Sequence, residues 1–180
     1  MLKLYRQFLL FALSLFIFCC GHLYANTISF SKVEKQNPQL VGKILYTYWF
    51  WDIYYAALYA PTKNFSWRHS FFLKLTYLRD FSAKSIIEET IDQMTSQTQK
   101  NSDDDLKKWQ NQLQNIFPDI KKNQSLIGYY DGKQRTLFFT GQGRYLGQVD
   151  SLAFSKSFFA IWLSDQSENL ELSRQLRGLK

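Results

Sequence analysis

The chain has 180 residues, of which 22 are basic and 15 are acidic, and its formal net charge is +7. A chain of this length can fold as one domain with a proper hydrophobic core. Its lysines and arginines are scattered along the sequence, whereas nucleic-acid binding requires a concentrated basic surface. The composition therefore argues against a nucleic-acid partner. The excess of positive charge instead favours solubility of the protein, or affinity for acidic small molecules or an anionic membrane surface.

The first 25 residues have the pattern of a cleaved secretory signal. Lys3 and Arg6 precede an apolar run at residues 8–20, and Ala25 supplies a small residue at the expected cut. A retained membrane anchor is the less favoured alternative, because a spanning helix needs about 20 apolar residues. We therefore expect a signal peptide at residues 1–25 and an exported single domain at residues 26–180.

Cleavage of this signal would simplify the chemistry of the chain. It removes Cys19, Cys20 and His22, which leaves no cysteine and only His69 as histidine, and it lowers the net charge to +5. Disulfides, thiolate catalysis and cysteine-ligated metals are then excluded. A lone histidine in a loop-like stretch is typical of a surface residue. We expect neither a metal site nor a cofactor in the mature domain.

The N-terminal half of the domain has strand patterns. Residues 27–33 alternate polar and apolar side chains and predict a first strand. Residues 41–60 are crowded with aromatic and β-branched side chains, and this stretch is too long for one ordinary strand. It therefore predicts two strands with a bend or bulge near residues 50–52. The alternation in residues 71–78 predicts a further, half-buried strand.

Two helices are expected next. Ser82 can cap a helix whose apolar side includes Ile86, and Ser102 can cap a second one. The acidic triplet at residues 103–105 favours the positive end of that second helix, so it needs no bound cation to explain it. Pro118 ends the second element.

The C-terminal part returns to strands and then to helices. Residues 124–130 and 135–140 flank Asp131-Gly132, which is a tight hairpin signal, and residues 145–149 predict another strand. A buried helix starts after Asp150 or Ser151, and a shorter one follows residue 167 with Gly178 beyond its end. This order predicts an α+β fold, with an antiparallel sheet covered on one face by helices.

Five stretches carry a family resemblance. They are residues 52–61 (DIYYAALYAP), 75–80 (LTYLRD), 117–119 (FPD), 158–163 (FFAIWL) and 176–179 (LRGL). In this order they resemble the bacterial chalcone isomerase-like proteins, which are related to plant chalcone isomerases and plastid fatty-acid-binding proteins. The resemblance implies an open-faced sandwich, with a ligand cleft between a large antiparallel sheet and a helical layer. It also implies a periplasmic location.

The resemblance also indicates candidate residues. The plant isomerases act without a cofactor, through an arginine and a threonine on the strand pair and a tyrosine and an asparagine on the first helix. The matching positions fall at Gly42 (with Lys43 adjacent), Tyr54, Ile86 and Gln93. Lysine lacks the planar fork of arginine and isoleucine cannot form hydrogen bonds, so the catalytic set does not carry over. The binding relatives use a tyrosine and an arginine, for which Tyr54 and Lys43 are the candidates.

Three functions remain open. The first is a non-catalytic protein that holds a small amphipathic, fatty-acid-like molecule in the cleft, with candidate ligand-binding residues Tyr54, Lys43 and Gln93. The second is a cofactor-free isomerase of the chalcone isomerase type, with Tyr54 as hydrogen-bond donor or acid. The third is a periplasmic scaffold or partner protein whose cleft is filled by its own bulky side chains, namely Trp49, Phe50, Trp51 and Trp109.

Overall fold

The structure, a computed structural model, describes residues 29–97 and 101–179. The predicted signal peptide lies outside the described residues, as do residues 27 and 28 of the predicted first strand. Within the described ranges, no helix is both long enough and apolar enough to cross a membrane.

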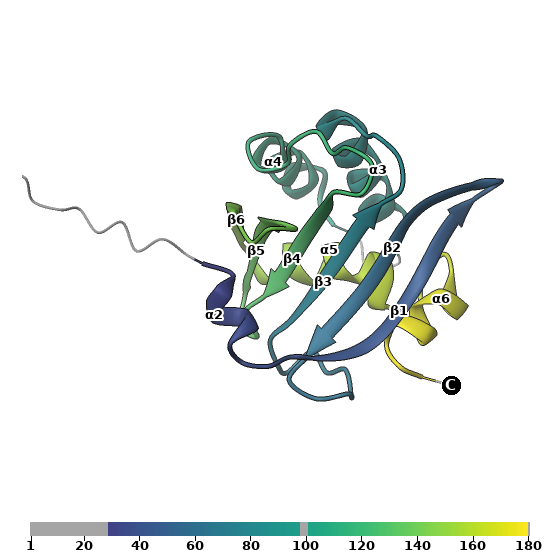
Figure 1. Ribbon diagram of the computed structural model, residues 1–180. Coiled ribbons are helices and arrows are strands. Elements are labelled where there is room, and N and C mark those ends of the chain that lie inside the picture. Colours follow the sequence, from purple (N-terminus) through teal and green to yellow (C-terminus); the bar gives the residue numbers. More distant parts are fainter. Residues whose placement is uncertain (1–28, 98–100, 180) are drawn as a thin grey trace, which may run out of the picture.

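The described chain forms a six-stranded sheet in which every strand pairs antiparallel with the next one in sequence (Figure 1). The strands are β1 (Gln39–Tyr48), β2 (Trp51–Ala60), β3 (Phe71–Tyr77), β4 (Ser125–Tyr130), β5 (Arg135–Thr140) and β6 (Tyr145–Asp150). Helices α3 (Ala83–Ser96) and α4 (Asp103–Gln114) connect β3 to β4, and α5 (Leu152–Leu163) and α6 (Leu170–Leu176) follow β6. The predicted α+β fold, an antiparallel sheet with helices on one face, is confirmed.

The two strands expected in residues 41–60 are β1 and β2. They are joined by a two-residue turn at Trp49 and Phe50, because Tyr48 pairs with Trp51. Trp49 has a φ of 55°, in the left-handed region that bulky side chains rarely adopt. The predicted bend is thus a tight hairpin turn.

The predicted helix starts at Ser82, Ser102 and Ser151 are confirmed. Each hydroxyl accepts a hydrogen bond from the backbone N–H three residues ahead, at 3.1, 3.1 and 3.2 Å. Helix α6 ends as predicted at Gly178, whose φ is +72°. There the N–H groups of Gly178 and Leu179 donate to the carbonyls of residues 175 and 174, which is the Schellman arrangement.

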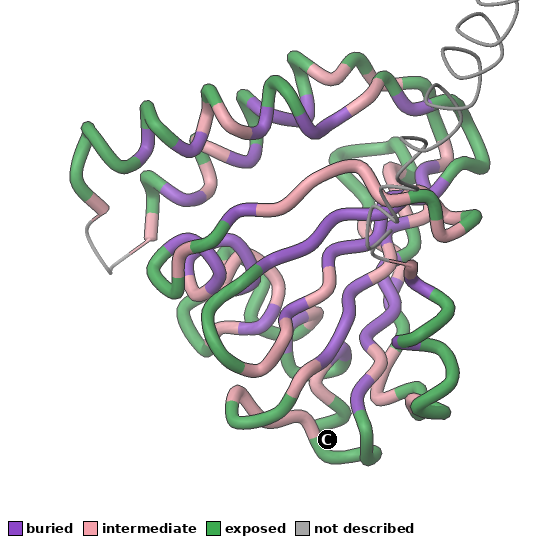
Figure 2. The backbone as a smooth tube through the Cα atoms, turned by 90° about the vertical axis from the view of Figure 1, so that its left-hand side faces the viewer, coloured by how far each residue is buried: buried purple, intermediate pink, exposed green. Residues whose placement is uncertain are grey.

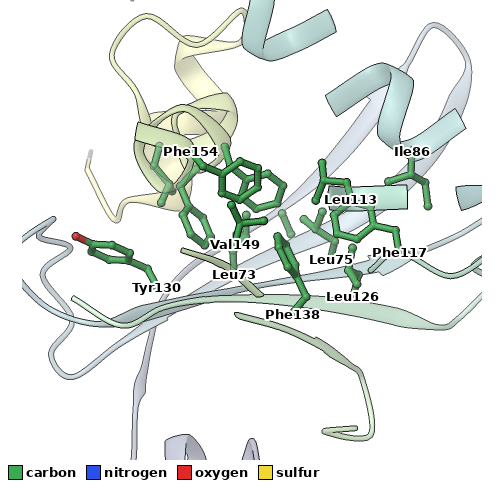
Figure 3. Packing of buried hydrophobic residues seen from close by; sticks show 14 of the residues in the cluster. Leu73, Leu75, Ile86, Leu113, Phe117, Leu126, Tyr130, Phe138, Val149 and Phe154 are labelled. Carbon is green, nitrogen blue, oxygen red and sulfur yellow. The ribbon is translucent and has the colours of Figure 1, made fainter. Parts of the chain in front are cut away.

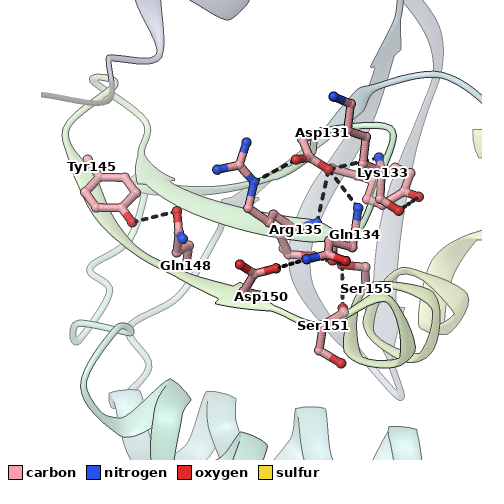
Figure 4. Close-up of polar contacts among 11 residues, drawn as sticks. Asp131, Lys133, Gln134, Arg135, Tyr145, Gln148, Asp150, Ser151 and Ser155 are labelled. Atoms are coloured by element: carbon pink, nitrogen blue, oxygen red, sulfur yellow. Dashed lines mark hydrogen bonds and ion pairs between the residues drawn. The ribbon is translucent and has the colours of Figure 1, made fainter. Parts of the chain in front are cut away.

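The predicted hairpin at Asp131-Gly132 connects β4 to β5 through residues 131–134 (Figure 4). Asp131 Oδ1 accepts hydrogen bonds from the backbone N–H groups of Lys133, Gln134 and Arg135 at 2.9 to 3.0 Å. Its second oxygen accepts from the Arg135 Nε at 2.8 Å. One carboxylate therefore accepts hydrogen bonds from three backbone N–H groups and one side chain of this turn.

The main core lies between the sheet and the helices that cover it. The sheet contributes Leu73, Leu75, Leu126 and Phe138, and Phe154 of α5 and Leu113 of α4 pack onto them (Figure 3). The strands carry long buried stretches, whereas exposed residues line the outer sides of the helices (Figure 2). The sheet thus has one thoroughly covered face, which is also the face of the candidate site.

The strand predicted at residues 27–33 is wrong where the structure describes it. Ser31–Glu34 form a short helix, α2, on the opposite face of the sheet. Phe30 and Val33 lie three residues apart, so one side of a helix can bury both. They pack with Phe72 and Phe139 in a second, smaller core cluster. The alternation of polar and apolar residues has the two-residue period of a strand, whereas the two buried side chains are three residues apart, as on a helix.

Candidate functional site

A cavity of about 700 Å³ lies between one half of the sheet and the helices α3, α5 and α6. Its floor consists mainly of side chains from β1, β2 and β3, with Leu126 of β4. Its roof includes Ile86 of α3, Phe158 and Trp162 of α5 and Leu172 of α6. The volume falls within the range of about 300 to 1,000 Å³ that is usual for small-molecule sites. The lining is mainly aromatic and aliphatic, so the cavity suits a largely apolar molecule.

Three tyrosines lie side by side on the cavity floor. Tyr46 pairs with Tyr54 between β1 and β2, and Tyr54 pairs with Tyr77 between β2 and β3. Directly opposed residues project from the same face of a sheet, so all three rings point into the cavity. The rings of Tyr46 and Tyr54 are stacked, with centroids 5.0 Å apart, and those of Tyr54 and Tyr77 meet edge to face at 5.8 Å.

The hydroxyl of Tyr54 is tied to the helical layer. It accepts a hydrogen bond from the indole N–H of Trp162 on α5 at 2.9 Å. Burial raises the pKa of Tyr54 well above its usual value, and the bond from Trp162 lowers it only in part. The hydroxyl therefore keeps its proton at ordinary pH. No acceptor for that proton occurs in residues 29–97 and 101–179, so Tyr54 has a donor to offer a molecule in the cavity.

The rim of the cavity is acidic. Gln93 of α3 donates hydrogen bonds at 3.1 Å both to Glu89, one turn earlier, and to Glu168, in the segment before α6. Burial raises the pKa of Tyr46, and the negative charges of Glu89 and Glu168 raise it further. The part of the chain that the structure describes contributes no lysine or arginine to the cavity lining.

Tyr54 and Gln93, two of the predicted site residues, both line the cavity, but Lys43 does not. The position predicted for Lys43 is wrong because neighbouring residues of a strand point to opposite faces of the sheet. Ile44 and Tyr46 face the cavity, whereas the Lys43 ammonium lies on the other face, 4.7 Å from the ring centroid of Tyr55. A shift of one residue along β1 thus removes the only predicted cation from the site.

Position 42 faces the helical layer, but no side chain fits there. A Cβ atom at Gly42 would collide with the backbone carbonyls of Gln175 and Leu176 in the last turn of α6. The end of this helix therefore occupies the space that an arginine side chain would need. Packing of α6 against β1 therefore requires glycine at position 42.

The four bulky residues considered as cleft fillers lie elsewhere. Trp49, Phe50 and Trp51 are exposed at the tip of the β1–β2 hairpin. Trp109 is buried, and its ring packs against Phe154 at 5.6 Å, outside the cavity lining. The filled-cleft interpretation is therefore wrong for these side chains.

Sequence reasoning missed Trp162, the partners of Tyr54 on the floor, and the two rim glutamates. The spacing of Phe158 and Trp162, four residues apart, is a helical signal for a shared face. The alternation of β1 could likewise have placed Tyr46 beside Ile44. No local signal joins Glu168 to Glu89, because the two lie far apart in sequence and are linked only through the hydrogen bonds of Gln93 in the folded chain. Across the described residues, no group of three or more His, Cys, Asp or Glu side chains could hold a metal ion.

Comparison with known proteins agrees with this architecture. The chalcone isomerase-like family matches residues 25–178. The chain belongs to the chalcone isomerase-like family. An uncharacterised protein of Haemophilus influenzae is 25% identical over 150 residues, which cover 83% of this chain and 72% of that protein. Among solved structures, this chalcone isomerase-like protein is similar in fold to a fatty-acid binding protein of Arabidopsis thaliana. The TM-score is 0.58 at 12% identity, covering 78% of this chain and 87% of the plant protein.

Proposed function

We propose that this protein is a non-catalytic binding protein that holds a small amphipathic, lipid-like molecule between its sheet and its helices. The observation that carries the proposal is the cavity of about 700 Å³, whose walls are mainly aromatic and aliphatic and also carry uncharged hydroxyl and amide groups. The name of the structural neighbour, a fatty-acid binding protein, supports a ligand of this kind. The signal pattern at residues 1–25 supports export, and we propose that the protein acts in the periplasm.

The polar groups of the cavity favour an uncharged head group. Tyr54 offers a hydroxyl proton to an oxygen acceptor, and the described lining contains no cation that could neutralise a carboxylate. Glu89 and Glu168 at the rim would repel an ionised fatty acid. We therefore propose an alcohol, an ester or a similar neutral polar end in place of the ionised fatty acid that the family resemblance implies.

Displacement of the fluorescent probe N-phenyl-1-naphthylamine tests both parts of the proposal. Three competitors with the same twelve-carbon chain are compared: dodecanol, dodecanoate and dodecylamine. We expect all three to displace the probe, and dodecanol to bind at least about tenfold more tightly than dodecanoate. If none displaced the probe, the binding function would be contradicted. If dodecanoate bound as tightly as dodecanol, the neutral head group would be contradicted while binding itself stood.

The surroundings of Tyr54 do not favour the isomerase alternative. Its hydroxyl meets the Trp162 indole, and its ring lies between those of Tyr46 and Tyr77. Ile86 lines the cavity and cannot form hydrogen bonds, and the amide of Gln93 is engaged by two carboxylates. Conversion of a chalcone to a flavanone by the purified protein would contradict the non-catalytic proposal.

A further inference from the structure

The tip of the β1–β2 hairpin is an exposed aromatic surface. It consists of Tyr48, Trp49, Phe50 and Trp51, which are 60%, 77%, 88% and 56% exposed. The hairpin projects beyond the other strands of the sheet (Figure 1). Four consecutive aromatic residues in water are unfavourable unless they contact something else, so the tip has the character of an interaction surface.

The conformation of the turn adds to this argument. Trp49 occupies a left-handed conformation, with φ at 55°, where glycine or asparagine is the usual residue. Its ring is 77% exposed and lies beside the neighbouring rings of the tip, with centroids 6.5 Å from Tyr48 and 6.4 Å from Phe50. The sequence thus keeps a bulky aromatic residue at a position that costs backbone energy and contributes nothing to the core. Such a position points to a function outside the fold.

Basic groups lie directly behind the aromatic tip. The guanidinium of Arg79 lies 4.0 Å from the ring centroid of Trp51. Lys122 shares a shallow surface depression with Phe50, Trp51 and Arg79. Asp52 and Asp80 also line this depression, and Asp80 pairs with Lys121 at 3.0 Å. The hairpin tip is therefore apolar, and the surface behind it carries charges of both signs, with Arg79 and Lys122 beside the aromatic rings.

We infer that this tip docks on a phospholipid bilayer, with the aromatic rings at the boundary between head groups and acyl chains. Tryptophan and tyrosine are enriched at that depth, and arginine and lysine above them can reach lipid phosphates. The positive net charge of the chain complements an anionic membrane surface. Tyr48 belongs both to the tip and to the cavity lining, so docking brings one side of the cavity to the bilayer. The inference goes beyond the proposed function and does not depend on it.

Sedimentation with vesicles tests the inference on the full protein as it is recovered from cells. Two vesicle types are used: phosphatidylcholine alone, and equal parts of phosphatidylcholine and phosphatidylglycerol. The tip variant combines Trp49→Gly and Phe50→Ser, and glycine suits the left-handed turn, so this variant should unfold no earlier than wild type. The matched control combines Leu40→Ser and Leu152→Ser, since both leucines are 46% exposed and lie outside the tip.

We expect wild type to bind both vesicle types, and the anionic one more tightly. The tip variant should bind at least about tenfold more weakly, and the leucine control should bind like wild type. Equal binding by wild type and the tip variant would overturn the inference. So would a wild-type dimer that the tip substitutions convert to monomers without any change in vesicle binding, because the tip would then be an interface between two copies.

A local measurement separates the tip from any contribution of the apolar segment at residues 8–20. Vesicles with brominated acyl chains quench tryptophans that enter the bilayer. We expect quenching in wild type and a clear loss of the quenched fraction in Trp49→Phe, which keeps the apolar surface but removes one fluorophore. If quenching in Trp49→Phe equalled that in wild type, Trp49 would not enter the bilayer and the inference would fail.

Discussion

Tyr54 combines the two properties that the site requires of a single residue. Its ring forms part of the apolar floor, and its hydroxyl, held by Trp162, keeps a proton that it can donate. Burial raises its pKa, so the proton remains in place over the whole range in which proteins are normally assayed. A free tyrosine, by contrast, would begin to lose its proton as the pH approaches about 10.

Tyr54→Phe should therefore weaken dodecanol binding by about three- to tenfold, the effect of one neutral hydrogen bond. In wild type the affinity should stay constant between about pH 6 and pH 10, because the raised pKa keeps Tyr54 protonated throughout. Probe displacement across this range checks both expectations. Tyr59→Phe is the matched control, since Tyr59 stacks on Phe72 on the other face of the sheet. A fall in wild-type affinity centred near pH 10 would contradict the role of burial.

The rim glutamates give a second prediction for single residues. Glu89→Gln combined with Glu168→Gln should strengthen dodecanoate binding several-fold and leave dodecanol binding unchanged, because only the anion is repelled. Titrations at low ionic strength give the largest difference, since 0.1 M salt largely screens exposed charges that lie more than about 10 Å apart. Glu88→Gln serves as control, as this glutamate lies on the same helix outside the cavity lining. Unchanged dodecanoate affinity in the double variant would show that the rim charge does not select the ligand.

At the scale of elements, the position of α6 depends on the absence of a side chain at Gly42. The carbonyls at the end of the helix lie where a Cβ atom would be, so Gly42→Ala must displace either β1 or α6. We expect a loss of about 1–3 kcal/mol in the free energy of unfolding, as for other overpacked sites. Denaturant unfolding measures it. Lys43→Ala, one residue further and on the outer face, should cost less than about 1 kcal/mol. Equal effects of the two substitutions would contradict this packing.

The β4–β5 hairpin depends in the same way on one carboxylate. Burial raises the pKa of Asp131, but its hydrogen bonds from Arg135 and the turn amides outweigh this and hold the pKa below its usual value. A lowered pKa in the folded state stabilises the fold above the unfolded pKa of about 3.9, and that stabilisation is lost as the pH falls further.

Asp131→Ala should therefore lower the free energy of unfolding by about 2 kcal/mol at neutral pH. The difference from wild type should shrink as the pH falls below about 4, because Asp131 of the unfolded wild-type chain then takes up a proton while the folded carboxylate, with its lowered pKa, resists protonation. Unfolding curves at several pH values provide the measurement. Glu88→Ala, which breaks only the exposed pair with Lys84, should change stability by less than about 0.5 kcal/mol. A difference for Asp131→Ala that stayed constant into acid would contradict the assignment.

At the scale of the whole molecule, local signals predicted the fold well. The serine caps, the glycine after α6 and the Asp131 turn are each decided by neighbours a few residues away, and the structure has them where the sequence indicates. The short α2 helix was missed because Phe30 and Val33 are buried by strands that lie far away in sequence. Propensity within a few residues cannot report such a contact.

The candidate site was predictable only in part, for a related reason. Tyr54 and Gln93 lie in the cavity, but Lys43 does not, because it is the neighbour of the matching position Gly42 and adjacent residues of a strand point to opposite faces. The bond from Trp162 to Tyr54 joins residues 108 positions apart, and the one from Gln93 to Glu168 joins residues 75 positions apart. Contacts of this range are set by how α5 and α6 pack over the sheet, which no single stretch of sequence specifies.

The central claim is that an apolar chain lies inside the cavity between the sheet and the helices. The most direct test is NMR spectroscopy of the protein saturated with ¹³C-labelled dodecanol, which records contacts between ligand protons and assigned side chains. We predict intermolecular contacts to the rings of Tyr54, Phe158 and Trp162 on the floor and roof of the cavity. Contacts confined to Trp49 and Phe50 at the hairpin tip, with none to the cavity rings, would contradict the claim.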